Sequence, residues 1–145
     1  MKLSEEEKKA IVEYRLDKAK DTLLDVSISI QNNRWNNAAN RLYYACFYAA
    51  IALLINDGHE ARTHSGVRAL LGLHYVKTGI IDEELSQAYQ KTFHLRQTGD
   101  YDDLAIVTEN DVKPLVEPAE KFIAHVEDLI KNHLCFAKCK QKSKI

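Results

Sequence analysis

The chain has 145 residues, enough for one domain that folds without disulfides or a structural metal. Hydrophobic residues make up 46% of the sequence and charged residues 28%, and the formal net charge is -1. This balance excludes a broadly basic surface, so any nucleic-acid contact has to use a local patch. The 5 glycines and 2 prolines are few for this length and favour long helices over many short strands.

The cysteines and the apolar runs indicate a protein of the reducing cytoplasm. The 3 cysteines are odd in number, which argues against a secreted disulfide framework. The first ten residues contain no apolar segment of the kind that signal peptides have. The longest apolar run, residues 42–55, is shorter than the ~20 residues that cross a bilayer, so we expect a buried core helix and no membrane span.

The first predicted helix follows a capping box in which Ser4 and Glu7 each satisfy a free backbone N–H of the other. Its apolar stripe recurs at steps of four and three residues, through Val12, Leu16, Ala19, Leu23, Val26 and Ile30. Residues 31–33, with two asparagines, end it because asparagine tolerates turn geometry.

The second predicted helix starts near Trp35 and is apolar on nearly all sides, which is typical of the central helix of a fold. Residues 57–58, an Asp-Gly pair, end it. One side carries a different stripe of cationic and aromatic residues, namely Arg41, Tyr44 and Tyr48.

Three further helices are predicted in the second half of the chain. One begins at a cap on Thr63 or Ser65 and closes at Gly79. The next is capped by Asp82 and is expected to end at Gly99. The last begins near the capping pair Thr108 and Asp111, and its prolines at 114 and 118 predict a late start or a kink.

Together these patterns predict an all-α fold, an antiparallel up-and-down bundle of about five helices. We expect the bundle to occupy residues 1–134. Residues 135–145, with four lysines, are expected to form a solvated basic tail, and a nucleic-acid-contacting arm is the alternative.

The residues that could bind a ligand or take part in a reaction are densest in the stretch 95–103. Here Arg96 precedes the acidic and aromatic turn of Asp100 and Tyr101. A guanidinium group offers five donors in a planar fork that matches a phosphate or carboxylate. The structural alternative is an arginine near a helix C-terminus that pairs with a nearby aspartate. Arg96 also extends the stripe of Leu85, Tyr89 and Thr92, which predicts that it faces a seam between helices.

Two other groups allow a functional and a structural interpretation. The stripe of Arg41, Tyr44 and Tyr48 forms either ordinary packing or one wall of a polar pocket. His64, at the predicted start of a helix, is either a capping residue or part of an anion site. The histidines and cysteines show no metal-ligand spacing, so we expect neither a metal nor a cofactor.

Four segments of the chain resemble the HEPN domain family, in particular a branch of small stand-alone prokaryotic HEPN proteins. They are RLYYACFYAA (41–50), THSGV (63–67), HYVKTG (74–79) and the stretch from LRQ (95–97) to DY (100–101). The resemblance spans roughly residues 6 to 132, in order. It implies an up-and-down helical bundle that commonly forms a homodimer.

The resemblance also implies a function. Many HEPN proteins are metal-independent RNases, several are toxins, and a minimal nucleotidyltransferase often serves as the antitoxin. Their motif is an arginine, a spacer of four to six residues and a histidine at the dimer interface. Arg96 matches the arginine, but Tyr101 stands where the histidine is expected.

The replacement of histidine by Tyr101 changes the expected chemistry. A histidine titrates near neutral pH and suits proton transfer. An ordinary tyrosine has a pKa of about 10 and is a poor general base, although it can position a substrate or donate a proton. His94 faces away from Arg96 on the same helix, whereas His64 is a candidate if the fold brings it close.

Three hypotheses follow. The first is a module that binds RNA, a nucleotide or a nucleotidyltransferase partner in a system of the toxin–antitoxin type. The second is a metal-independent RNase toxin, and the third is a structural helical dimer without a ligand site. The predicted catalytic residues are Arg96, Asp100 and Tyr101, and the predicted ligand-binding residues are Arg41, Tyr44, Tyr48 and His64.

Overall fold

The computed structural model describes residues 3–101, 104 and 106–142, and it describes the side chains of this range except those of Tyr101 and residues 133–142. The described chain is helical, as predicted. The elements are α1 (Glu5–Gln31), α2 (Trp35–Asn56), α3 (His64–Leu71), the π-helical turn η1 (Gly72–Val76), α4 (Glu83–Tyr101) and α5 (Glu109–Lys142).

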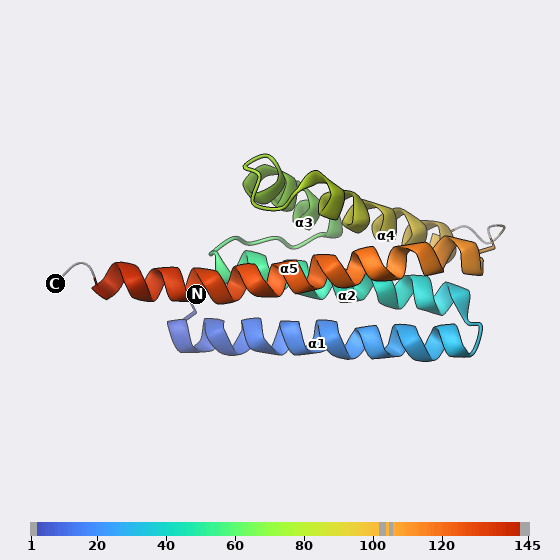
Figure 1. The fold of residues 1–145 in the computed structure, drawn as a ribbon, viewed down its shortest axis with the longest axis horizontal. Helices are drawn as coiled ribbons and strands as arrows, with labels where there is room; N and C mark the ends of the chain where they lie inside the picture. The colour runs from blue at the N-terminus through green and yellow to red at the C-terminus, as the bar shows by residue number, and fades with distance from the viewer. Residues whose placement is uncertain (1–2, 102–103, 105, 143–145) are drawn as a thin grey trace.

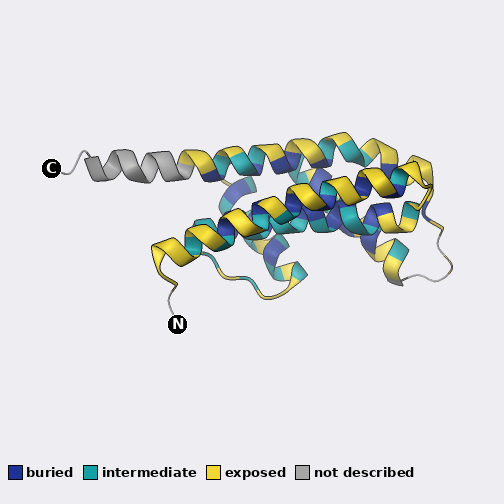
Figure 2. Ribbon diagram, turned by 90° about the horizontal axis from the view of Figure 1, so that it is seen from below, coloured by how far each residue is buried: buried dark blue, intermediate teal, exposed yellow. Residues whose placement is uncertain are grey.

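The three long helices α1, α2 and α5 lie alongside one another, and α3 and α4 lie on the side of α2 that is away from α1 (Figure 1). Helix α2 packs against α1, α3, α4 and α5. Helix α2 runs opposite to α1, α4 runs opposite to α2, and α5 runs opposite to α4 (Figure 1), so the prediction of an antiparallel bundle is confirmed. The buried residues, dark blue in Figure 2, follow the inward faces of these helices.

Helix α2 is the central element, as its apolar character on nearly all sides predicts. By length and composition it could also cross a membrane, because the whole helix is longer than the apolar run 42–55. Within the fold, however, 61% of its most apolar window is buried by the other helices. Cys46, Ala49 and Leu53 have no exposed surface at all, and this burial raises the pKa of the Cys46 thiol to about 12.

The predicted helix starts are confirmed by their caps. The Ser4 hydroxyl accepts the backbone N–H of Glu7 at 3.1 Å, and the Asp82 carboxylate accepts that of Leu85 at 2.9 Å. At the start of α5, the backbone N–H of Thr108 donates to Asp111 at 2.9 Å. Each bond satisfies a backbone donor that an isolated helix end leaves without a partner.

Gly99 does not end α4, which continues to Tyr101, so this prediction is wrong. The glycine has a packing role instead, because a Cβ at this position would lie 3.1 Å from Cγ2 of Val107 and 3.6 Å from Oδ1 of Asn36. The missing side chain lets the segment before α5 approach α4 closely. In contrast, Gly58 and Gly79 have positive φ angles of 83° and 80° and do serve as helix stops.

Helix α5 begins at Glu109, so the late start expected from its prolines is also wrong. Pro114 and Pro118 lie inside the helix, four residues apart and therefore on one side of it. Each removes one backbone hydrogen bond, and neither is buried, so water reaches the carbonyl groups left without partners. The helix runs to Lys142 and crosses the predicted boundary between residues 134 and 135, and the role of the basic tail stays a prediction.

Candidate functional site

Arg96 lies in the seam between α4 and α2, where its position on the stripe of α4 directs it. It is only 7% exposed. Its guanidinium carbon lies 5.2 Å from the ring centre of Tyr43 and 5.3 Å from that of Tyr44, within the range of cation–π contact. Its Nε donates a hydrogen bond of 3.2 Å to Oδ2 of Asp100, one helical turn further on.

A chain of hydrogen bonds links this ion pair to Arg41 on α2. Oδ2 of Asp100 also accepts a bond of 3.0 Å from Nδ2 of Asn40. Oδ1 of Asn40 in turn accepts two bonds from Arg41, at 3.0 Å from Nε and 2.7 Å from Nη2. The guanidinium carbon of Arg41 lies 5.2 Å from the ring centre of Tyr44. Two guanidinium groups therefore lie against one tyrosine ring. The carboxylate of Asp100 pairs with Arg96 and is linked to Arg41 through Asn40.

His64 lies against the same two tyrosines from α3. Its Nδ1 is 2.6 Å from the hydroxyl oxygen of Tyr43, and its ring packs on Phe47 with 4.4 Å between ring centres. Burial and then the positive charge of Arg96 lower the pKa of His64 below its usual 6.5, so the imidazole is neutral at pH 7. Thr63 positions it, because its hydroxyl caps α3 through the backbone N–H of Gly66 at 2.9 Å.

The site carries a local excess of positive charge. Arg68 of α3 lies with its guanidinium carbon 4.3 Å from the ring centre of Phe93. Among the described side chains, neither Arg41 nor Arg68 has an ion pair with a carboxylate. Burial raises the pKa of Tyr43 to about 12, and the charges of Arg96 and Arg68 oppose that rise. The patch is thus locally cationic in a chain whose net charge is -1.

We call this group the Arg96 cluster. It comprises Asn40, Arg41, Tyr43, Tyr44, His64, Arg96 and Asp100. The structure thereby brings together residues of three separate segments, on α2, α3 and α4. Tyr48 is adjacent through Tyr44, with 5.9 Å between ring centres, but it faces α1. The side chain of Tyr101 lies outside the described residues.

The sequence interpretation missed three members of this region, namely Asn40, Tyr43 and Arg68. Tyr43 has no exposed surface and follows the buried side of α2, so it was indistinguishable from ordinary core. In the sequence, only the position of Asn40 directly before Arg41 indicates that Asn40 belongs to the site. Arg68 stands one turn after His64, on the same short helix.

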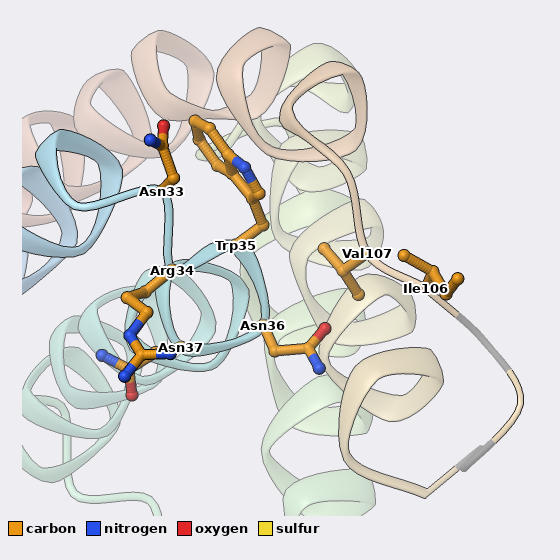
Figure 3. Close-up of a pocket in the computed structure, with 7 residues that line it drawn as sticks. All are labelled: Asn33, Arg34, Trp35, Asn36, Asn37, Ile106 and Val107. Atoms are coloured by element: carbon orange, nitrogen blue, oxygen red, sulfur yellow. The ribbon is translucent and has the colours of Figure 1, made fainter.

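A separate pocket lies where the α1–α2 turn meets the segment before α5 (Figure 3). Asn36 points toward Ile106 and Val107, and Trp35 points toward α5, where Nζ of Lys113 is 5.9 Å from its ring centre. None of the residues that line this pocket belongs to the Arg96 cluster. Its described lining residues include no pair of groups suited to proton transfer, so we place the candidate chemistry at the Arg96 cluster.

The Arg96 cluster can hold an anion next to flat aromatic surfaces. Guanidinium forks match phosphate oxygens, and tyrosine rings offer faces on which a base can stack. A neutral imidazole nearby can accept a proton. Among the described residues, no group of three or more His, Cys, Asp or Glu side chains is arranged to hold a metal ion.

Comparison with known proteins agrees with the fold and the resemblance. A UPF0332 protein of Thermotoga maritima is 40% identical over 126 residues, which cover 87% of this chain and 96% of that protein. The Methanocaldococcus jannaschii protein named "Putative toxin MJ0605" is 30% identical over 129 residues, covering 89% of this chain and 92% of its own length. The crystal structure of TT1696 from Thermus thermophilus superposes with a TM-score of 0.70 at 20% identity over 81% of this chain and 96% of its own, which shows the same fold.

The family model of the HEPN domain matches residues 12–129, which is most of the chain and includes every described member of the Arg96 cluster. The resemblance drawn from the four sequence segments is confirmed by this match. The chain belongs to the HEPN domain family.

Proposed function

We propose that this chain is a toxin-like HEPN module that binds a phosphate-bearing ligand, RNA or a nucleotide, at the Arg96 cluster. One observation carries the proposal: the guanidinium groups of Arg41 and Arg96 lie 5.2 and 5.3 Å from the ring centre of Tyr44, and the Asp100 carboxylate pairs with Arg96. Two relatives bear the name "Putative toxin", which is consistent with this class of function.

The balance of charge explains why an anion would be bound here. A buried arginine paired with one carboxylate is electrostatically complete, and Arg96 with Asp100 fits that description. Arg41 adds a second positive charge that is half-buried and is held by the neutral amide of Asn40. A phosphate beside Arg41 and Tyr44 would supply the missing negative charge and place a nucleoside next to an aromatic ring.

Binding of a labelled single-stranded RNA, measured by fluorescence anisotropy, tests this proposal. We expect Arg41→Ala to weaken binding about tenfold or more, since a lost charge-assisted contact is worth ~1.5–3 kcal/mol. Arg96→Lys keeps the charge but loses the planar fork, so it should also weaken binding. Lys91→Ala removes one positive charge from an exposed position on the same helix and should have little effect.

Circular dichroism and thermal unfolding must show that each variant is folded, because Arg96 is nearly buried. Equal affinity of the wild type, Arg41→Ala and Lys91→Ala would overturn the proposed site. Binding of a nucleoside without phosphate as tightly as of the nucleotide would also contradict it.

A second candidate function is metal-independent RNA cleavage, and the position of His64 favours it. In this reaction the 2′-oxygen attacks the adjacent phosphorus, the bond to the 5′-oxygen breaks, and a cyclic phosphate and a 5′-hydroxyl form. The proton of the 2′-hydroxyl must pass to a base. Nε2 of neutral His64 can take it in the tautomer in which Nδ1 carries the proton and donates it to the hydroxyl oxygen of Tyr43. A second proton must reach the leaving 5′-oxygen, and Tyr101 is the proposed donor.

His64→Gln tests this second candidate. It should abolish production of the cyclic phosphate while RNA binding stays within about threefold of the wild type, and Tyr101→Phe should lower the cleavage rate. Cleavage by His64→Gln at the wild-type rate would remove His64 from the mechanism. RNA binding without any cleavage by the wild type would leave the binding function and reject the enzymatic one.

Partners and location are also proposals. We propose a homodimer and a nucleotidyltransferase antitoxin as partners, and a cytoplasmic location, on the basis of the family and of the cysteine pattern. Light scattering of the purified chain tests dimer formation. Co-purification with the product of a neighbouring nucleotidyltransferase gene tests the second partner.

A further inference from the structure

One side of α2 is less buried than the rest of the helix. Among the residues from 38 to 55, those with partly exposed surface recur at helical spacing and include Arg41, Tyr44, Tyr48 and Ile51, whereas the others are buried. This stripe runs between α1 on one side and α3 with α4 on the other, because Tyr48 contacts side chains of α1 and Tyr44 contacts His64 and Arg96. Figure 1 shows α1 and α4 on opposite sides of α2.

Along this stripe, aromatic rings and cations form a continuous series from the Arg96 cluster to α1. The rings of Tyr44 and Tyr48 are 5.9 Å apart between centres. Nζ of Lys18 lies 4.8 Å from the ring centre of Tyr48 and 5.9 Å from that of Tyr14. The guanidinium carbon of Arg15 lies 6.0 and 5.9 Å from the same two rings. Tyr14 is 59% exposed, so the series ends at the surface of α1.

Lys18 and Arg15 have different partners from the neighbouring Lys20. Lys20, two residues after Lys18, forms an ion pair with Glu127 on α5. Among the described side chains, Lys18 and Arg15 have no ion pair with a carboxylate and lie against tyrosine rings instead. Nε of Arg15 is buried and has no hydrogen-bond partner in the described part of the chain.

Aromatic rings beside cations that have no ion pair with a carboxylate are the features that bind single-stranded nucleic acid. Bases stack on aromatic faces whatever their sequence, and cations beside the rings neutralise the phosphates between bases. A two-fold contact with a second copy centred on this stripe is less favourable, because it would place the cations of one copy near those of the other.

We infer that the RNA surface of this protein extends from the Arg96 cluster across α2 onto α1, along Tyr44, Tyr48, Lys18, Arg15 and Tyr14, and holds a single-stranded RNA of several nucleotides. We call this surface the aromatic track. The inference rests on the proposed function, since the Arg96 cluster forms one end of the track. It assigns Tyr48 and Lys18 a role that a mononucleotide site would not need.

Two labelled RNAs separate this inference from the proposed function. One is a dinucleotide, which the Arg96 cluster alone can hold, and the other is a single strand of about ten nucleotides. Tyr48→Ala and Lys18→Ala should each weaken binding of the longer RNA about tenfold and leave dinucleotide binding unchanged. Tyr48→Phe keeps the ring and should restore most of the affinity. Lys9→Ala, an exposed lysine on the opposite side of α1, is the matched control.

The outcomes are distinct. If the wild type binds the dinucleotide, and Tyr48→Ala and Lys18→Ala bind the longer RNA as tightly as the wild type does, the aromatic track is overturned while the Arg96 cluster stands. If the wild type binds neither RNA, the proposed function and the track fail together. If Tyr48→Ala changes the oligomeric state in light scattering without changing RNA affinity, the stripe is an interface between copies and the inference is wrong.

Discussion

Tyr43 and His64 are joined by a hydrogen bond of 2.6 Å between the phenol oxygen and Nδ1, although 21 residues separate them in the sequence. The bond ties the start of α3 to the middle of α2, and Arg96 lies against the same tyrosine ring. It fixes the orientation of the imidazole and leaves Nε2 as the nitrogen that can face a ligand. The relationship places a titratable group beside the cationic cluster.

The position of His64 makes stability depend on pH. Because burial and the charge of Arg96 lower its pKa below 6.5, the folded protein binds fewer protons than the unfolded chain below that pH. The free energy of unfolding should therefore fall as the pH drops through 6.5 and should gain nothing from His64 well above it. Urea unfolding of the wild type and His64→Gln as a function of pH measures this, and the variant should show the shallower decline. Identical pH profiles would contradict the shifted pKa.

The charge of Arg96 should be visible in the titration of His64. Removing it in Arg96→Gln takes away the second cause of the lowered pKa, so the pKa of His64 should rise toward 6.5. The imidazole resonances of His64, followed by NMR across the pH range, give this value directly. Lys91→Ala is the control and should leave the titration unchanged. An unchanged pKa of His64 in Arg96→Gln would show that the charge of Arg96 does not affect the titration of His64.

The cap of α3 should contribute to both stability and function. Thr63→Ala removes the hydroxyl that accepts the backbone N–H of Gly66 at 2.9 Å, so it should lower the free energy of unfolding by ~1 kcal/mol. Thr63→Ser keeps the acceptor and should lose much less. Since His64 is the first residue of α3, the rate of RNA cleavage in the second candidate function should fall with the same ranking. Equal stability of the alanine and serine variants in urea unfolding would show that the cap does not matter.

Two glycines with helical backbones should respond differently to alanine. A Cβ at Gly72 meets nothing within 4 Å, so Gly72→Ala should raise the free energy of unfolding by ~0.5–1 kcal/mol through helix propensity. At Gly99 the same change places a Cβ 3.1 Å from Val107, so Gly99→Ala should gain nothing or lose stability. Urea unfolding of both variants measures the difference. An equal gain at both positions would refute the packing role of Gly99.

The contact between Tyr75 and Asp57 should hold the π-helical turn against the end of α2. The Tyr75 hydroxyl donates to Oδ2 of Asp57 at 2.5 Å, and burial together with this carboxylate raises the pKa of the phenol. Tyr75→Phe should therefore cost ~1.5–3 kcal/mol of unfolding free energy, as expected for a hydrogen bond to a charged group. Thermal unfolding measures the loss. A Tyr75→Phe variant as stable as the wild type would show that water compensates for the missing bond.

The fold could be predicted from the sequence because each helix carries its own local signals. The stripes of α1 and α2 and the caps at Ser4, Thr63 and Asp82 depend on residues three or four positions apart. The errors arose where tertiary packing overrides such signals. Gly99 resembles a helix stop in sequence, but its neighbour Val107 comes from a different segment.

The candidate site could be predicted only in part. Arg96 and Arg41 were found because guanidinium chemistry and helical spacing mark them locally. Asn40 joins Asp100 to Arg41 because α2 and α4 lie side by side. Asn40 and Asp100 are 60 residues apart in the sequence, so no local pattern predicts their contact. The same holds for Lys18, which shares no motif with Tyr48 and meets it only because α1 packs on α2.

The central claim is that the cationic face between α2 and α4 binds a phosphate-bearing ligand. An NMR titration of the isotope-labelled protein with a short single-stranded RNA tests it most directly. The account predicts that the largest chemical-shift changes fall on Arg41, Tyr44, His64 and Arg96, and that inorganic phosphate at high concentration reduces them. Shift changes confined to the pocket between Trp35 and Val107, or no changes at all, would contradict it.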